Sequence, residues 1–209
     1  MEINIQHKSS EVSRRMQGKR SLAILDTVKV ELKTELELLF DTFQKALNKT
    51  QKQMSEFPPL SRSRTLEASI MQSCFAEMLM LNFGDKAFYG KHKRLVLSVK
   101  GYIILFKKLD NKGMPMNITT ANVQGIMSQN MQLDLFAQSS YNDAPILYFG
   151  YQKNRVGQYV NPQIVYIDDS KISFVISDEI FGNIKVVDNL STDKVAPKLK
   201  DKISLKKAE

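Results

Sequence analysis

The residues with the clearest chemical potential form the segment Asp168-Asp169-Ser170-Lys171. An acidic-x-Lys element serves metal-dependent nucleases of the restriction-endonuclease type, in which the carboxylate holds Mg²⁺ and the lysine steadies the attacking water. Here the element stands between two β-rich blocks, where Asp and Ser side chains commonly bond to the backbone of a turn. The pattern therefore predicts a turn, with a nuclease site of Asp168, Asp169 and Lys171 as the alternative.

A second candidate site is the stretch from Lys86 to Lys108, which holds seven Lys or Arg residues and no acid. If Arg94–Lys108 is one strand, alternation sends its side chains to two opposite faces. One face would carry Arg94, Lys100, Tyr102, Phe106 and Lys108. Such a face offers cations for phosphates and aromatic rings for base stacking, and so predicts nucleic-acid binding. The alternatives are that helices cover this face, or that a hairpin at Lys100-Gly101 breaks the alternation.

Other catalytic chemistry is poorly represented in the chain. Its histidines are His7 and His92, and Cys74 lies on the apolar side of an expected helix. We find no zinc-ligand spacing and no glycine-rich phosphate loop, which favours a non-catalytic protein with no cofactor and no metal. A single cysteine indicates a cytoplasmic protein, and the absence of an apolar run of about 20 residues argues against membrane insertion.

The elements that position these residues change in character near Lys93. From Ser21 to about Gln53, apolar residues recur every three or four positions, which predicts one long amphipathic helix. Phe57-Pro58-Pro59 ends it. A second helix is expected from Arg64 to Phe83, with Gly84 as its C-cap. Two helices with so short a connection predict an antiparallel hairpin.

After Lys93 the pattern favours β-structure. The expected strands are Arg94–Leu109 (whole or as a hairpin), Ile146–Tyr151, Gln163–Ile167 and Ile172–Ser177, and Thr119 or Thr120 would cap a short helix through Gln129. The predicted fold class is therefore α+β, with an N-terminal helical hairpin followed by a mostly antiparallel sheet and one short helix. The expected divisions are a basic flexible segment at 1–20, the hairpin at 21–85, a β-rich domain at 86–180 and a Lys-rich tail at 181–209.

The net charge of +8 is concentrated towards the two ends of the chain. Residues 1–20 carry five Lys or Arg and two Glu, and residues 190–209 carry six Lys and three acids. Polar basic tails attract phosphate without sequence preference. Charge alone therefore does not establish a nucleic-acid-binding protein.

The first expected helix suggests a different function, because its apolar stripe would form an interface if the rest of the chain left it uncovered. The interface residues predicted on this basis are Leu32, Leu36, Leu39 and Phe43. We therefore expect a protein partner or a homodimer, with nucleic acid as the alternative partner.

Short motifs across residues 100–152 add a family resemblance. They are Tyr102, Phe106-Lys107-Lys108-Leu109-Asp110, Met116-Asn117-Ile118-Thr119-Thr120, Leu135-Phe136 and Gly150-Tyr151-Gln152. In these the chain resembles a family of uncharacterised bacterial proteins that lie beside helix-turn-helix and metallopeptidase regulators in mobile-element or phage-defence-like operons. The resemblance implies a regulatory or interaction role. It supplies no catalytic residues.

Overall fold

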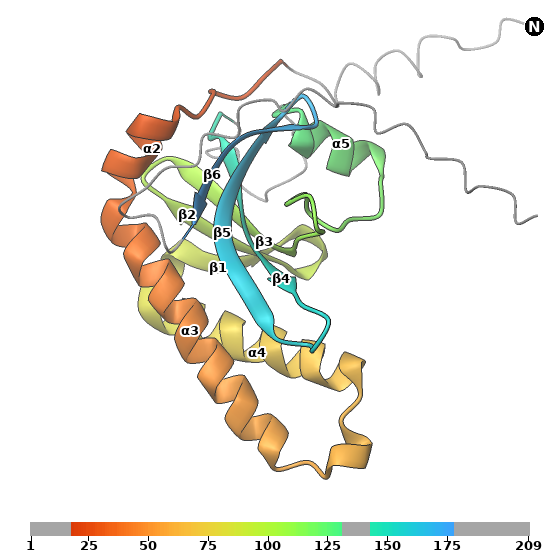
Figure 1. The fold of residues 1–209 in the computed structure, drawn as a ribbon. Coiled ribbons are helices and arrows are strands. Elements are labelled where there is room, and N and C mark those ends of the chain that lie inside the picture. Colours follow the sequence, from red (N-terminus) through yellow and green to blue (C-terminus); the bar gives the residue numbers. More distant parts are fainter. Residues whose placement is uncertain (1–17, 131–142, 178–209) are drawn as a thin grey trace, which may run out of the picture.

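The computed structural model describes residues 18–130 and 143–177, and places helices on both faces of a six-stranded sheet (Figure 1). The strands lie in chain order: β1 (Ala87–Gly90), β2 (Arg94–Val99), β3 (Tyr102–Lys108), β4 (Ile146–Lys153), β5 (Tyr159–Asp168) and β6 (Lys171–Ser177). Neighbouring strands are antiparallel except β3 and β4, which run parallel. This arrangement confirms an α+β fold with a mostly antiparallel sheet.

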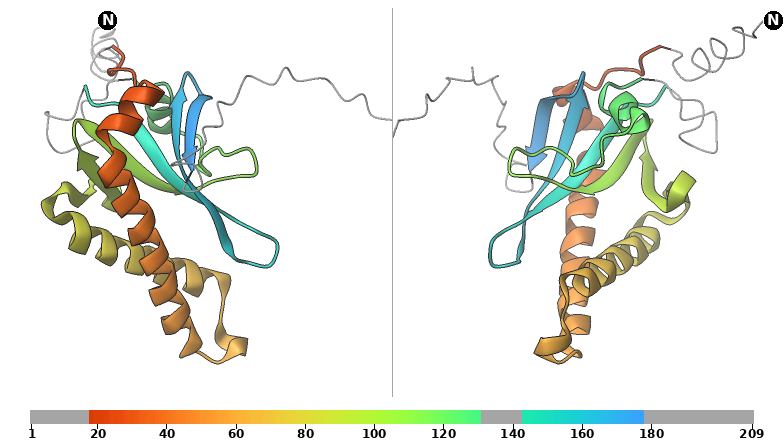
Figure 2. Two further views of the ribbon diagram at one scale, coloured as in Figure 1. Left: turned by 60° about the vertical axis from the view of Figure 1, so that its left-hand side comes forward. Right: turned by 90° about the vertical axis from the view of Figure 1, so that its right-hand side faces the viewer.

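Three helices lie on one face of the sheet (Figure 2). They are α2 (Leu25–Glu31), α3 (Lys33–Ser55) and α4 (Arg64–Phe83), and a 3₁₀ turn at Pro59–Ser61 connects α3 to α4. The second helix has the predicted bounds, because the Ser63 hydroxyl accepts from the Leu66 amide at 3.1 Å and Gly84 ends the helix with φ +56°. α3 and α4 pack against each other but cross obliquely, so the predicted antiparallel hairpin is not clearly formed.

The predicted first helix is interrupted at Leu32, which has φ −96° and ψ +8°. The cause is a side chain from the turn between β2 and β3. Lys100 Nζ donates to the Glu31 carbonyl at 2.6 Å, and that carbonyl would otherwise accept from the amide of Glu35 one helical turn later. A side chain inserted into the i→i−4 ladder is a common cause of a helix kink, and no proline or glycine marks this one in the sequence.

Two apolar clusters hold the layers together. The larger joins α2, α3 and α4 to one face of the sheet, and the smaller lies on the opposite face beneath α5 (Ala121–Met127). The larger cluster crosses the expected division between residues 85 and 86, so helices and strands share one core. Among the described residues, no helix is both long and apolar enough to cross a bilayer.

Several local predictions are confirmed. The Thr120 hydroxyl caps α5 by accepting from the Val123 amide at 3.3 Å, and β5 and β6 form a hairpin that pairs Asp168 with Lys171. β1 is an element that the sequence did not reveal. β5 also begins earlier than expected, at Tyr159, within a segment that reads as a loop because it contains Asn161 and Pro162. The expected tails at 1–20 and 181–209 lie almost wholly outside the described residues.

Candidate functional site: a groove beside the β4–β5 hairpin

The residues predicted to form a basic and aromatic strand face do not lie on one face. The chain turns at Lys100 and Gly101, which have φ +46° and +81°, and Val99 pairs with Tyr102. The apolar residues show which face each strand position occupies. Leu95, Leu97 and Tyr102 belong to the core beneath the helices α2 to α4, whereas Val96 belongs to the cluster beneath α5. Tyr102 and Phe106 therefore face the helices, and Arg94 faces the other way.

Tyr102 and Phe106, the two aromatic residues of that set, make contacts within the fold. Tyr102 is only 7% exposed, and its hydroxyl donates to Glu31 Oε2 at 2.8 Å. Burial, and then Glu31, raise the pKa of Tyr102 to about 12. Phe106 packs edge-on against Phe75, with ring centroids 5.1 Å apart. The ring-stacking part of the predicted nucleic-acid surface is therefore wrong, because the helices cover it.

Lys100, also predicted to bind nucleic acid, forms an ion pair with Glu35 at 2.8 Å. Burial alone would raise the pKa of Glu35, but the hydrogen bond and charge of Lys100, the residue's own backbone amide and the charge of Lys86 bring that pKa below its usual value. Lys108, at the end of β3, is exposed. Of the five predicted residues, Arg94 and Lys108 thus remain without an ion-pair partner among the described residues.

The predicted interface residues are also covered by the chain itself. Leu32, Leu36 and Leu39 are 0% exposed, and Phe43 is 1% exposed. The Phe43 ring lies 5.6 Å from that of Phe75. These side chains fill the core between the helices and the sheet and cannot also present themselves to a partner. The prediction that these four residues form an interface with a partner is therefore wrong, because they are buried between the helices and the sheet.

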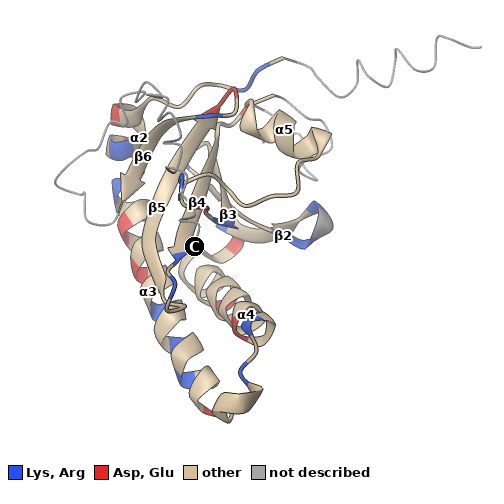
Figure 3. Cartoon of the chain, turned by 45° about the vertical axis from the view of Figure 1, so that its right-hand side comes forward, with Lys and Arg blue, Asp and Glu red and all other residues tan. Residues whose placement is uncertain are grey.

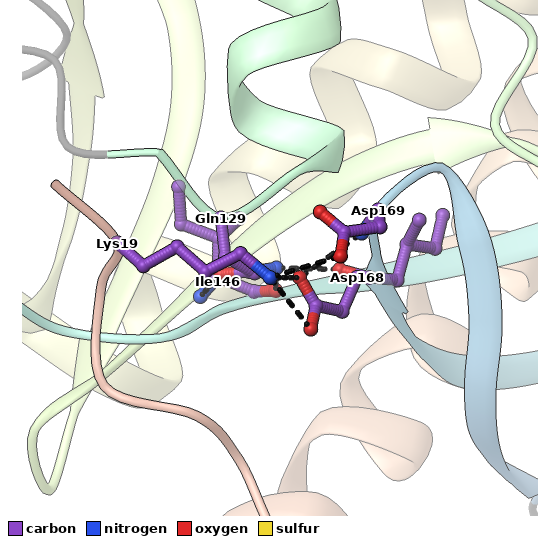
Figure 4. Close-up of polar contacts among 6 residues, drawn as sticks. Lys19, Gln129, Ile146, Asp168 and Asp169 are labelled. Atoms are coloured by element: carbon purple, nitrogen blue, oxygen red, sulfur yellow. Dashed lines mark hydrogen bonds and ion pairs between the residues drawn. The ribbon is translucent and has the colours of Figure 1, made fainter. Parts of the chain in front are cut away.

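The acidic turn that suggested a nuclease binds the N-terminal part of the described chain (Figure 4). Lys19 Nζ lies 2.9 Å from Asp168 Oδ1 and 3.1 Å from Asp169 Oδ2. Asp169 and Ser170 have φ of +46° and +62°, as two central residues of a type I′ hairpin turn require. No group of three or more His, Cys, Asp or Glu among the described residues could hold a metal ion.

Beside this turn lies a buried amide that the sequence did not reveal, Gln129 (Figure 4). Its Nε2 donates to the carbonyls of Ile146 at 2.9 Å and Ile167 at 2.7 Å, and its Oε1 accepts from the Ile146 amide at 3.0 Å. The backbone carbonyl of Gln129 accepts from the Arg20 amide at 2.7 Å. Gln129 therefore ties α5, the strand ends and residues 19–21 into one junction. All of these contacts are with backbone atoms of the chain itself, so the role of Gln129 is structural.

Open space lies at the other end of the molecule, in a groove of about 540 Å³ between the helices and the β4–β5 hairpin. The C-terminal half of α3, the α3–α4 connection, the first turn of α4 and the hairpin form its walls. The lining residues are Gln44, Leu47, Thr50, Gln51, Met54, Arg62, Glu67, Val156, Gly157, Gln158, Tyr159 and Val160. The lining combines side-chain amides and apolar side chains with two charged residues, Arg62 and Glu67, so the groove offers hydrogen bonds as well as apolar contact.

One wall of the groove is fixed by an ion pair packed on aromatic rings. Lys153 Nζ lies 2.7 Å from Glu67 Oε2 and 4.8 Å from the centre of the Tyr159 ring. The Tyr159 ring meets that of Tyr151 at 5.1 Å. Burial, followed by the charge of Glu67, raises the pKa of Tyr159 well above its usual value. The tyrosine is therefore neutral at physiological pH, and the carboxylate of Glu67 is neutralised by Lys153.

The rim of the groove is both apolar and basic. Val156, which lines the groove, is 84% exposed at the tip of the hairpin. On the α3–α4 connection, two residues before the lining residue Arg62, Leu60 is fully exposed. Arg62 donates to the carbonyl of Phe57 at 2.8 Å, and it forms no ion pair with a carboxylate among the described residues. Arg155, next to Val156, is exposed and likewise makes no ion pair there.

Comparisons with protein-family models, curated proteins and solved structures found no match to this chain.

Proposed function

We propose that this chain is a non-catalytic interaction protein that binds an acidic, partly apolar segment of a partner protein in the groove beside the β4–β5 hairpin. The observation that carries the proposal is the composition of the rim. Val156 in the lining and Leu60 on the neighbouring connection are both exposed, and each lies within two residues in sequence of an arginine that forms no ion pair with a described carboxylate.

The charge of the groove and its surroundings determines which sign of charge a partner should carry. Glu67 is the carboxylate in the groove lining, and it already pairs with Lys153. Arg62, Arg155 and the exposed Arg64 therefore leave the rim positive. Opposite charge on a partner would speed encounter and fix its orientation, while burial of its apolar side chains would supply most of the affinity.

The resemblance of residues 100–152 supports the same class of role. It implies a regulatory or interaction protein in a phage-defence or mobile-element setting, and we expect the chain to act in the cytoplasm. Two of its motifs, Phe106-Lys107-Lys108-Leu109-Asp110 and Gly150-Tyr151-Gln152, meet along β3 and β4, where Lys107 pairs with Gly150 and Lys108 with Tyr151. They maintain the sheet from which the β4–β5 hairpin projects, so in this chain their contribution is architectural.

The test is selection from a displayed library of random 16-residue peptides on the purified full-length protein. We expect the recovered peptides to be rich in Asp or Glu and in large apolar residues. The variant Arg155→Glu/Val156→Asp should bind them at least about tenfold more weakly, since both changes oppose the proposed ligand and lie on an exposed hairpin tip.

The matched control is Lys112→Glu/Ile118→Asp, which makes the same kinds of change on another exposed loop, where Ile118 is 87% exposed. This control should retain full peptide affinity. Recovery of basic peptides, or equal loss of binding in both variants, would overturn the proposal.

A further inference from the structure

A second surface lies at the margin of the sheet, around the turn between β1 and β2. This turn is a short 3₁₀ segment, Lys91–Lys93, and Lys91 and Lys93 are both exposed. Arg94 follows at once as the first residue of β2. Figure 3 shows basic residues in blue at this turn, at the end of β2.

The strand register brings a further cation to the same place. Val96 pairs with Leu105 in the antiparallel β2–β3 ladder, so continuing the register by two residues sets Arg94 opposite Lys107. Both side chains lie on the face of the α5 cluster, because each stands two residues from a member of that cluster along its own strand. Two like charges in directly opposite positions destabilise a sheet.

No described carboxylate forms an ion pair that would offset this repulsion. Lys91, Lys93, Arg94 and Lys107 form no ion pair with a described carboxylate. The acid nearest to Lys107 in sequence is Asp110, whose Oδ1 accepts from the amides of Lys112 and Met114 at 2.8 and 2.9 Å. Lys107 is half-buried, and burial, followed by the charge of Arg94, lowers its pKa.

From this geometry we infer that Lys91, Lys93, Arg94 and Lys107 form a binding site for the phosphate backbone of a nucleic acid. An anion placed between Arg94 and Lys107 would remove their repulsion, and the two lysines of the turn would contact neighbouring phosphates. The site shares only Arg94 with the surface predicted from the sequence. It uses no aromatic stacking, so we expect affinity that depends strongly on salt and weakly on base sequence.

This inference does not depend on the proposed groove. The groove is lined by α3, α4 and the β4–β5 hairpin, whereas the four cations stand on the β1–β2 turn and on β2 and β3. A chain with both surfaces would connect a protein segment to a nucleic acid.

The experiment is fluorescence anisotropy of a labelled 20-nucleotide oligothymidine and of a labelled 20-base-pair duplex, titrated with nucleic-acid-free full-length protein between 50 and 300 mM salt. The variant Lys91→Ala/Lys93→Ala should weaken binding at every salt concentration. It should also flatten the slope of log affinity against log salt by about 1.4 for the single strand, as expected when two phosphate contacts are lost. The two probes distinguish a preference for single-stranded from double-stranded nucleic acid.

The control Lys33→Ala/Lys52→Ala removes the same charge from exposed positions on α3. If this control lowers affinity and slope as much as the turn variant does, binding reflects only the overall charge of the protein and the site is overturned. Absence of salt-dependent binding to both probes would overturn it equally. The groove variant Arg155→Glu/Val156→Asp also changes the charge of the protein. Its effect on nucleic-acid binding is therefore judged by the slope of log affinity against log salt, and this slope should match that of the unaltered protein.

Discussion

The side chain of Leu109 lies directly over the α-carbon of Gly150. A Cβ atom built on Gly150 would stand 2.4 Å from Leu109 Cγ, well inside van der Waals contact, and Leu109 is only 2% exposed. The Leu109 amide also donates to the Tyr151 carbonyl at 2.8 Å. The end of β3 is therefore fixed on β4 by a contact that only glycine permits at position 150.

We predict that Gly150→Ala lowers the free energy of unfolding by about 1–3 kcal/mol, because the added methyl group displaces a buried leucine. Urea denaturation measures the change. Gly90→Ala is the comparison, since its Cβ would meet Val96 Cγ2 at 3.3 Å and needs a much smaller adjustment. In Leu109→Ala/Gly150→Ala the two effects should be less than additive, and strict additivity would contradict the contact.

A second prediction concerns the buried amide of Gln129. Gln129→Leu should destabilise the fold by roughly 2–5 kcal/mol, because the Ile146 amide and the Ile146 and Ile167 carbonyls lose buried partners. Thermal unfolding followed by circular dichroism would show the loss. Gln124→Leu, at an exposed position of α5, should leave the melting temperature nearly unchanged.

The third prediction is the pH dependence that Glu35 confers. Its pKa is lowered in the folded state, so its contribution to stability is present above its unfolded pKa of about 4.3 and is lost as the pH falls through the folded value. Glu35→Gln should therefore be less stable than the unaltered protein at pH 7, and the difference should shrink towards pH 3.

Urea denaturation at several pH values measures this difference. Glu37→Gln removes an exposed neighbouring carboxylate and should show little pH-dependent change. A gap between Glu35→Gln and the unaltered protein that widens on acidification would be inconsistent with the Lys100 ion pair.

A fourth prediction separates the exposed and buried parts of the junction in Figure 4. Lys19 and Asp169 are largely exposed, with side chains 42% and 70% accessible, so Lys19→Met should cost less than about 1 kcal/mol of stability. The cost should fall further in high salt. A loss as large as that of Gln129→Leu would show that the lysine holds more of the junction than its exposure indicates.

The sequence predicted those elements whose signals are local. Ser63 and Gly84 bound α4, and Asp169 and Ser170 mark the β5–β6 turn, because capping and turn chemistry act within a few residues. The kink at Leu32 was not predicted, because the side chain that causes it, Lys100, lies on the β2–β3 turn far away in the sequence. β1 was not predicted either, since four residues give too short a pattern to read.

The candidate sites likewise depend on contacts between residues that are distant in the sequence. Alternation was the right rule for β2 and β3, but the two-residue turn at Lys100-Gly101 reversed which residues share a face. Arg94 and Lys107 become neighbours only through the ladder register. The groove is built from α3, α4 and a hairpin about 100 residues away along the chain, and no local pattern could assemble it.

The parallel pairing of β3 and β4 also has a consequence for how the chain folds. β1 to β3 and β4 to β6 are each successive antiparallel strands joined by short turns, so each can form from contacts close in sequence. The pairing that joins these two halves aligns Ile103 with Ile146. Closing the long connection between them costs chain entropy before the contacts between β3 and β4 can form. The β3–β4 seam should therefore be the last part of the sheet to form and should set the folding rate.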